Sequence, residues 1–444
     1  MQPSPPRTPV AILGAGLTGL SAAFHLRSAG VDCRVFEREP HVGGHTITVE
    51  DDGFRFDRTG HLLHLRDPAT RALALSWIGD DWLEIERRSA IYAYGGYTRY
   101  PFQANMHGLP PAVAYECLLG FLKAHYATER PEPRSFDDFC RLHFGEGISR
   151  HFMVPYNTRL WGVPPSEITA AWCARFVPLP SLEDVVAGAV GLHDRELGYN
   201  ARFVYPRRGI GALSEGLARA AGPVELGRAP QRIELASRTL CFEGERVPFE
   251  SLISTAPLPK LIGLLDGVPE GVRGAASRLR CNHLYYLDVA LEVPCGRPYH
   301  WIYVPEERLP FYRVGCYSHF SPAMAPEGKA CLYVELADRR PPDLGELLPR
   351  VAAGLVELGV IGAPADIRYA RLRRLEHAYV VFDHAYYEAL EAVRAFLDAH
   401  GILSAGRYGA WNYSSMEDAL HFGRDAAQSA RARLGGGSGA EASS

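Results

Sequence analysis

The sequence lacks the features that define several classes of protein. Its nine cysteines are odd in number, scattered along the chain and never spaced as C-x-x-C, which indicates neither a disulfide framework nor a zinc site. A net charge of -4 provides no basic field for nucleic acid, so we expect no nucleic-acid partner. No run of roughly 18 uninterrupted apolar residues occurs, so we expect no membrane span.

The two ends of the chain also lack recognisable signals. The opening residues, MQPSPPRTP, contain no apolar stretch of the kind found in a secretory signal. Together with the unpaired cysteines, this predicts a cytoplasmic protein without a metal site. Residues 435–444, GGGSGAEASS, hold nothing that could pack, and we expect them to be disordered.

One motif present in the sequence indicates a dinucleotide. The apolar run Val10–Leu13 is typical of a buried strand and leads into the G-x-G-x-x-G of Gly14, Gly16 and Gly19. A helix and a second strand follow, and the strand ends at Glu37, 18 residues beyond the last glycine. The glycines permit a tight turn, close approach of backbone amides to a pyrophosphate and close helix–strand packing, and the acid can bind ribose hydroxyls.

The residues after the acid favour FAD over NAD. Glu37-Arg38 is followed by the pair Gly43-Gly44, which lets the chain pass close to the cofactor a second time. This spacing resembles the E-R-x-x-x-x-G-G fingerprint of the FAD-dependent amine oxidase superfamily. Gly406-Arg407 and the run Trp411–Met416 resemble that superfamily's C-terminal flavin segment, where a helix N-terminus points at the flavin.

The resemblance implies FAD as the cofactor and assigns residues to its site. They lie in the two N-terminal glycine segments, in the loop at Gly60 and in the C-terminal segment. The expected FAD-binding residues are Gly14, Gly16, Leu17, Thr18, Gly19, Glu37, Arg38, Gly43, Gly44, His45, Gly60, His61, Gly406, Arg407, Tyr413 and Met416.

These patterns predict an α/β fold with a Rossmann-like FAD-binding domain of the glutathione-reductase type. Helical and antiparallel β substrate regions are inserted into this domain. The expected segments are 1–67, 201–270 and 386–434 for the FAD-binding domain, 68–200 for a mainly helical insertion, 271–385 for an antiparallel β domain with a helix, and 435–444 for the tail.

Further stretches resemble UDP-galactopyranose mutase and protoporphyrinogen-oxidase-like bacterial flavoenzymes within the superfamily. The stretches similar to the mutase are Thr59–His64, Pro155–Pro164, Pro310–Val314 and Gly406–Met416. Those similar to the protoporphyrinogen-oxidase-like branch are Tyr205–Gly211 and Phe320–Pro326.

The mutase resemblance implies roles for individual residues. Arg313 and Tyr413 would contact a substrate diphosphate, which a guanidinium binds through paired hydrogen bonds. Arg175 would be a second cationic contact. The remaining substrate-site residues would be Tyr156 and Trp161, although both residue types are also common in cores.

Several positions depart from the mutase pattern. Ser415 replaces the family aspartate, Asn412 replaces an arginine, and the stretch that begins at Arg175 lacks the family's last arginine. Arg202, Arg207 or Arg208 could supply that charge. UDP-galactose itself is therefore not fixed as the substrate.

The leading hypothesis is a mutase-like isomerase that interconverts the pyranose and furanose forms of a nucleotide sugar through a reduced-flavin N5 adduct. It needs no side-chain nucleophile, and the sequence contains no Ser/His/Asp or Cys/His arrangement of that kind. The alternatives are an oxidoreductase of the amine oxidase or protoporphyrinogen oxidase type, and a catalytically idle FAD-folded scaffold. The sequence does not fix the oligomeric state, and a homodimer is one option.

His61 and His64 allow three interpretations. A metal site lacks a third ligand at suitable spacing. The mutase resemblance places both residues in a loop against the flavin, where they would act as catalytic residues sensitive to its redox state. In the third interpretation both imidazoles only bond to backbone.

Overall fold

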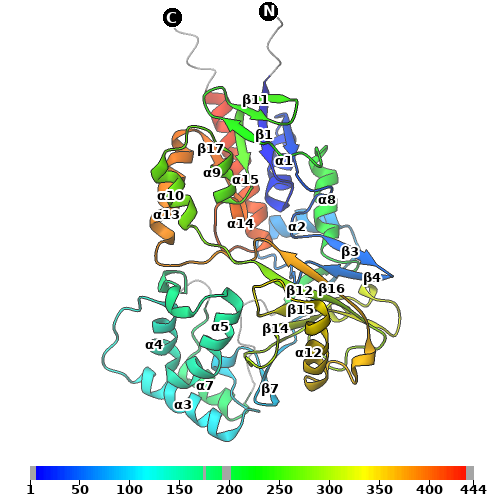
Figure 1. The fold of residues 1–444 in the computed structure, drawn as a ribbon, viewed down its shortest axis with the longest axis vertical. Helices are drawn as coiled ribbons and strands as arrows, with labels where there is room; N and C mark the ends of the chain where they lie inside the picture. The colour runs from blue at the N-terminus through cyan, green and yellow to red at the C-terminus, as the bar shows by residue number, and fades with distance from the viewer. Residues whose placement is uncertain (1–6, 174–176, 193–201, 437–444) are drawn as a thin grey trace, which may run out of the picture.

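The computed structural model describes residues 7–173, 177–192 and 202–436. Figure 1 shows a nucleotide-binding region at the top around β1 (Thr8–Leu13) and α1 (Leu17–Ser28), a helical region at the lower left and a β-sheet region at the lower right. Strands from the beginning, the middle and the end of the chain meet in the first region. This confirms the expected α/β fold with a discontinuous nucleotide-binding sheet.

The sheet of the nucleotide-binding region has six strands. Its order is β2-β1-β11-β10-β9, and β17 also pairs with β11. The pairs β1–β2, β1–β11 and β11–β17 are parallel, and the apolar residues of β1 are buried on both faces, as in other parallel sheets. The remaining strands are β2 (Cys33–Phe36), β9 (Arg232–Glu234), β10 (Thr239–Cys241), β11 (Arg246–Ser254) and β17 (Ile402–Ser404).

Helices cover this sheet, and α1 near the N-terminus packs against the C-terminal helix that contains Ala419 and Leu420. Thr18 in α1 donates its hydroxyl hydrogen to the carbonyl of Ala419 at 3.0 Å, and Ser21 donates to the carbonyl of Leu420 at 2.7 Å. The partner helix of α1 is α15 (Met416–Gly436). The other helices of this region are α2 (Pro68–Ile78), α8 (Gly211–Ala221), α9 (Leu258–Leu264), α10 (Glu270–Arg278), α13 (Tyr386–Ala399) and α14 (Gly406–Gly409).

The second sheet has seven strands in the order β16-β12-β15-β14-β13-β6-β7. Helix α12 (Leu344–Glu357) packs its apolar residues on one face. The strands are β6 (Ser89–Ala93), β7 (Gly96–Arg99), β12 (Leu284–Leu291), β13 (Trp301–Tyr303), β14 (Phe311–Cys316), β15 (Ala330–Leu336) and β16 (Ile367–Leu375).

Two two-stranded antiparallel sheets and a short helix that follows β14 are also present. They are β3 (Thr48–Asp51) with β4 (Phe54–Asp57), β5 (Trp82–Glu86) with β8 (Arg202–Pro206), and α11 (Tyr317–Phe320). The strands β5, β6 and β7 fall within 68–200, where the sequence analysis expected mainly helix. The strands β6 and β7 join the seven-stranded sheet, so residues 68–200 contribute to the helical region and to the β-sheet region.

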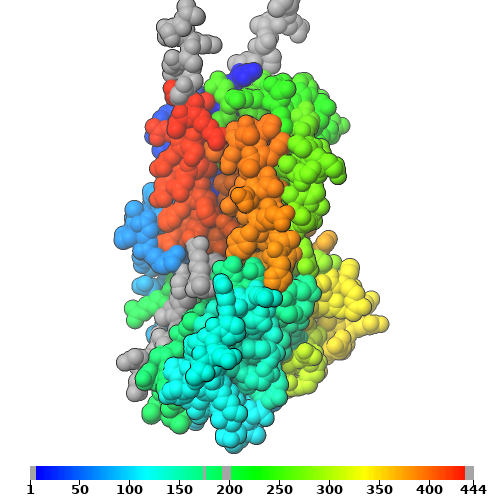
Figure 2. All heavy atoms as spheres, turned by 90° about the vertical axis from the view of Figure 1, so that its left-hand side faces the viewer, coloured from blue at the N-terminus to red at the C-terminus, as the bar shows by residue number. Residues whose placement is uncertain are grey.

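The helical region lies below the nucleotide-binding region. Figure 2 shows its outer face in cyan beneath α13 (orange) and α15 (red). A capping box of Ser135 and Asp138 begins α4. The helices are α3 (Pro111–His125), α4 (Phe136–Ile148), α5 (Val154–Trp161) and α7 (Leu182–Ala189).

Of the mainly helical insertion expected over 68–200, the helices α2, α3, α4, α5 and α7 lie within that range. Within the described residues, no helix combines the length and apolar character needed to cross a bilayer. Residues 437–444 of the tail lie outside the described residues, so their disorder stays a prediction.

The contact between α1 and α15 allows a direct test. A Cβ atom at Gly423 would lie 2.3 Å from the carbonyl oxygen of Thr18. We therefore expect Gly423→Ala to lower the unfolding free energy by about 1–3 kcal/mol and to reduce the amount of FAD retained on purification. Gly435→Ala on the same helix is the control, because no atom lies within 4 Å of its Cβ position. Equal thermal midpoints for the two variants would contradict this packing.

Candidate active site

Two glycine segments form a cradle at the end of β1. Gly14 has φ +98°, and its Cβ position would lie 2.3 Å from the hydroxyl oxygen of Thr255, so only glycine fits. The amide of Gly43 donates to the carbonyl of Ala15 at 2.8 Å. A Cβ on Gly16 would meet nothing nearer than the Cα of Gly44 at 4.0 Å. The backbone here is bare and open, as binding of a pyrophosphate requires.

Glu37 lies beside this cradle. It is 8% exposed, and one carboxylate oxygen accepts a hydrogen bond from the amide of Ala15 at 2.7 Å. The other accepts from the amide of Glu39 at 2.9 Å. Arg38 instead lies at the surface, where it pairs with Glu39 and Glu376. The predicted acid therefore lies at the nucleotide turn, whereas Arg38 makes its contacts on the protein surface.

The C-terminal segment returns to the same place. Gly406 has φ +86°, and a Cβ there would lie 2.7 Å from the Thr18 hydroxyl. Leu17, Thr18 and Gly19 form the first turn of α1, and Met416 begins α15. The predicted FAD residues from both ends of the chain thus lie close together.

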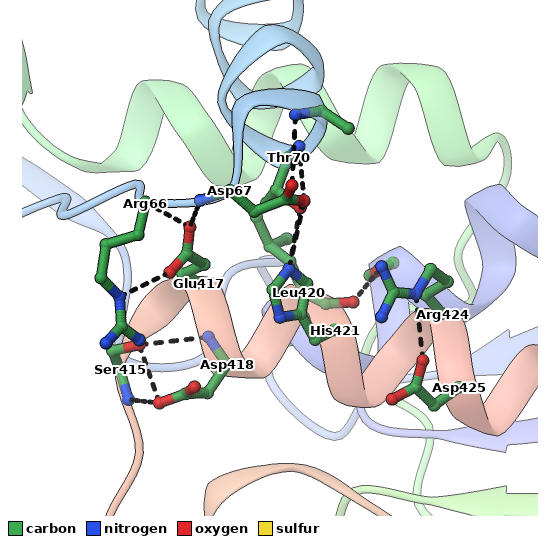
Figure 3. Close-up of polar contacts among 12 residues, drawn as sticks. Arg66, Asp67, Thr70, Ser415, Glu417, Asp418, Leu420, His421, Arg424 and Asp425 are labelled. Atoms are coloured by element: carbon green, nitrogen blue, oxygen red, sulfur yellow. Dashed lines mark hydrogen bonds and ion pairs between the residues drawn. The ribbon is translucent and has the colours of Figure 1, made fainter.

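Ser415, the residue that departs from the family pattern, begins α15. Its hydroxyl accepts from the amide of Asp418 at 3.1 Å, and the Asp418 carboxylate accepts from the amide of Ser415 at 2.8 Å, as Figure 3 shows. This reciprocal arrangement is a capping box. Next to it, the buried carboxylate of Glu417 accepts from the amides of Arg66 and Asp67 at 2.5 and 2.8 Å. The helix start is therefore tied to the segment that follows His64.

The imidazoles of His45 and His61 are half-buried and lie near one another. Burial lowers the pKa of His45 to about 3, with His61 and Arg58 contributing, and burial lowers the pKa of His61 to about 4. Nδ1 of His45 lies 3.3 Å from the hydroxyl of Tyr408. Nδ1 of His61 lies 3.3 Å from the carbonyl of Thr59. Both rings are therefore neutral near pH 7.

His64 makes different contacts from His61. Its Nδ1 lies 2.9 Å from the carbonyl of Arg202, and its ring packs edge-on against Phe203. Burial lowers its pKa to about 4, and its Nε2 atom has no hydrogen-bond partner among the described residues. The two histidines that the sequence grouped together thus face different neighbours.

The second sheet contributes a buried ion pair at the predicted substrate site. Arg313 in β14 donates to Glu335 in β15 at 2.6 Å and to the hydroxyl of Tyr379 at 3.1 Å. The two strands place Arg313 and Glu335 directly opposite each other. The Glu335 side chain is fully buried, and that of Arg313 is 18% exposed.

A group of tyrosines surrounds this ion pair, and we call it the tyrosine chamber. Burial raises the pKa of each of its phenols, so all are neutral donors near pH 7. The hydroxyls of Tyr156 and Tyr312 have no partner among the described residues, as expected where a ligand completes a site. Its members are Tyr156, Tyr303, Tyr312, Tyr333 and Tyr379.

Arg407 adds a second, half-buried cation, for which the described residues provide no acidic partner. It donates to the carbonyls of Ser414 at 2.8 Å and Ala378 at 3.2 Å. Its guanidinium lies 4.7 Å from the ring centre of Tyr413 and 5.8 Å from that of Tyr379. Arg313 and Arg407 together exceed the single charge of Glu335 by one, so the interior favours an anionic ligand.

The structure brings most predicted substrate residues to the chamber. Tyr156 and Trp161 come from α5. Trp161 and Tyr379 lie 6.3 Å from Tyr413 between ring centres, and the Tyr379–Tyr413 pair is stacked. Arg175 lies outside the described residues. Sequence reasoning missed Glu335, although a glutamate within the otherwise apolar strand Cys331–Leu336 was a usable signal.

A fold with this glycine cradle, the acid after β2 and the returning C-terminal helix defines a flavin-binding enzyme. The profile of the flavin-containing amine oxidoreductases matches residues 17–430. The chain therefore belongs to the flavin-containing amine oxidoreductase family, and FAD is its cofactor.

The solved structures extend this comparison over the whole chain. A reduced UDP-galactopyranose mutase has a TM-score of 0.88 at 26% identity and covers 96% of this chain and 95% of its own. A protein assigned as a protoporphyrinogen oxidase from Exiguobacterium sp. 255-15 has a TM-score of 0.74 at 17% identity, with 96% and 98% covered. At that identity, the second likeness concerns the fold alone.

Sequence comparison also finds a curated relative that matches part of the chain. Phytoene dehydrogenase of Streptomyces griseus is 27% identical over 308 residues, which cover 59% of this chain and 56% of the relative. The chain thus spans little more than half the length of this curated relative.

The buried ion pair leads to a stability prediction. Glu335→Leu leaves the Arg313 guanidinium buried without a carboxylate, and we expect it to cost about 3–5 kcal/mol of unfolding free energy. The double variant Arg313→Met with Glu335→Leu removes both charges and should lose clearly less. Thermal unfolding of the two single variants and the double variant measures this coupling. Additive losses would show that the two groups are not energetically paired.

Proposed function

We propose that this flavoenzyme is a mutase-like isomerase that acts on a nucleotide sugar with its FAD in the reduced state. The observation that carries the proposal is the excess positive charge of Arg313 and Arg407 inside an aromatic chamber. A nucleotide diphosphate matches this charge, and tyrosine hydroxyls suit a sugar. The likeness to a reduced UDP-galactopyranose mutase over nearly the whole chain supports it.

The chain's own residues would hold the cofactor in three ways. The open backbone at Gly16 and Gly44 would receive the pyrophosphate, and the N-terminus of α1 would offset its charge. The carboxylate of Glu37 would exchange its amide contact for ribose hydroxyls. Gly60, whose Cβ position would lie 2.4 Å from the hydroxyl of Tyr333, would hold the loop of His61 close to the chamber.

In this proposal the protein supplies position and charge rather than a nucleophile. The reduced flavin would supply an electron-rich nitrogen for the anomeric carbon. Arg313 would orient the diphosphate through its guanidinium, and Tyr413, stacked near Arg407, would donate a hydrogen bond. The neutral imidazoles of His45 and His61 would exclude water without adding charge.

The second candidate is an oxidoreductase that takes a hydride from an amine or an apolar C–H bond. The aromatic lining of the chamber favours it, because such substrates need an apolar surface next to the flavin. The sequence relationship to a phytoene dehydrogenase also favours it. The charge excess at Arg407 favours the isomerase.

Turnover with oxidised and reduced protein distinguishes the two candidates. For the isomerase, we expect conversion of UDP-galactose or another nucleotide sugar after dithionite reduction and none with oxidised protein, measured by chromatography of the products. For the oxidoreductase, we expect substrate-dependent bleaching of the oxidised flavin without added reductant. Peroxide formation from an amine by the untreated protein would overturn the isomerase proposal.

The role of Arg313 is tested separately by ligand binding. We expect Arg313→Ala to weaken binding of UDP-galactose to the reduced protein about 10- to 100-fold, because a hydrogen bond to a charged group contributes about 1.5–3 kcal/mol. The readout is the ligand-induced change in the flavin spectrum, and FAD content should stay at the wild-type level. Arg340→Ala is the control, since its side chain is 88% exposed and pairs with Asp338. Equal affinities for the two variants would remove Arg313 from the substrate site.

A further inference from the structure

Three side chains that can bind a metal ion meet at one end of the seven-stranded sheet. Cys295 lies in the loop between β12 and β13, Cys316 is the last residue of β14, and His319 lies in α11. One ligand atom from each residue lies within 4.8 Å of those of the other two. The sequence predicted no metal site, because these residues do not follow a metal-binding spacing along the chain.

The group is separate from the tyrosine chamber. Arg313 and Cys316 are three residues apart in one extended segment, so their side chains point to opposite faces of the sheet. Cys316 packs in the apolar cluster between the sheet and α12, and Cys295 packs against that cluster. A ligand bound to these sulfurs would therefore lie on the α12 face rather than beside the flavin.

The distances suit a tetrahedral ion with little movement. Zinc binds thiolate sulfur at about 2.3 Å and imidazole nitrogen at about 2.0–2.1 Å, which places two sulfurs of a tetrahedral site roughly 3.8 Å apart. Because the ligand atoms lie no more than 4.8 Å apart, the two sulfurs would need to approach each other by at most about 1 Å. A rotation about the cysteine χ1 angles supplies a change of this size.

The surroundings of His319 orient it as a ligand. Its Nδ1 atom lies 2.8 Å from the carbonyl oxygen of Tyr299. A carbonyl can only accept, so Nδ1 carries the hydrogen and the Nε2 lone pair is free to bind a metal. Metal-binding histidines in proteins commonly have this second hydrogen bond. It fixes both the tautomer and the direction of the ring.

The backbone holds both cysteines in place. The amide of Cys316 donates to the carbonyl of His300 at 2.9 Å. Next to Cys295, the amide of Gly296 donates to Val360 at 2.9 Å and the Arg297 guanidinium donates to Leu358 at 3.0 Å.

We propose that Cys295, Cys316 and His319 form a three-ligand site for a soft divalent ion, with Zn²⁺ as the best match. Two thiolates neutralise the ion, both thiol protons are released on binding, and neutral imidazole supplies the third ligand. The fourth position is taken by water or another small ligand. His319 also lines a cavity of about 740 Å³.

Zinc binding to the FAD-loaded, thiol-reduced protein tests the proposal. After incubation with Zn²⁺ and removal of excess ion, we expect one zinc per chain by elemental analysis. Co²⁺ in its place should give thiolate charge-transfer bands and the strong long-wavelength bands of a tetrahedral site, beyond the flavin absorption. A protein that takes up no zinc, or whose cobalt spectrum lacks thiolate bands, would overturn the proposal.

Variants separate this site from adventitious binding. Cys295→Ser and His319→Gln should each weaken Zn²⁺ affinity about 100-fold or more, since loss of an outer-sphere partner alone costs about 10–100-fold. Cys241→Ser, which changes another partly exposed cysteine, should bind zinc as the wild type does. Unchanged flavin spectra and thermal midpoints would show that the variants are folded. Equal zinc affinity in all three variants would contradict the site.

A disulfide between the two cysteines is the competing outcome. Intact-mass analysis of protein purified without reductant distinguishes the two, because a disulfide removes two hydrogens and a zinc complex leaves both thiols reactive after chelation. A disulfide between Cys295 and Cys316 that persists in mild reductant and blocks zinc uptake would overturn the proposal.

Discussion

The fold depends on backbone contacts at which no side chain fits. The helix residue Gly19, the pair Gly43-Gly44 and the helix residue Gly423 each lie against another backbone segment at a distance that excludes or strains a Cβ atom. Three parts of the chain thereby converge on the N-terminus of α1. The sheet behind them, the cradle and the position of α15 all follow from this close approach, and so does room for a pyrophosphate.

The interior next to the cradle combines burial with an uneven distribution of charge. Glu335 neutralises Arg313, whereas Arg407 contacts backbone carbonyls and aromatic rings among the described residues. The imidazoles of His45 and His61 add no charge, because burial keeps them neutral. An anion that entered would meet preorganised donors in a region of low dielectric, where each interaction is stronger than in water. Membership of the flavin family and this charge pattern together support the proposal of an anionic substrate.

Sequence reasoning worked where the signal was local. The glycine spacing, the acid at Glu37 and the amphipathic helices are encoded within short stretches. The strands β6 and β7 were missed, although the two-residue turn Tyr94-Gly95 with positive φ at both positions is a hairpin signal within a stretch read as helical. The pairing of Arg313 with Glu335 and the approach of Cys295 to Cys316 depend on strand register and chain return, which no local pattern specifies.

The positions of β17 and α15 in the sequence determine when, during translation, the nucleotide-binding sheet can be completed. The nucleotide-binding sheet starts with β1 at residue 8, but its edge strand β17 begins at residue 402 and α15 ends at residue 436. During synthesis, the helical region and the second sheet leave the ribosome while the first sheet still lacks an edge and α1 lacks its partner. The complete cofactor site can therefore form only after α15 has been translated.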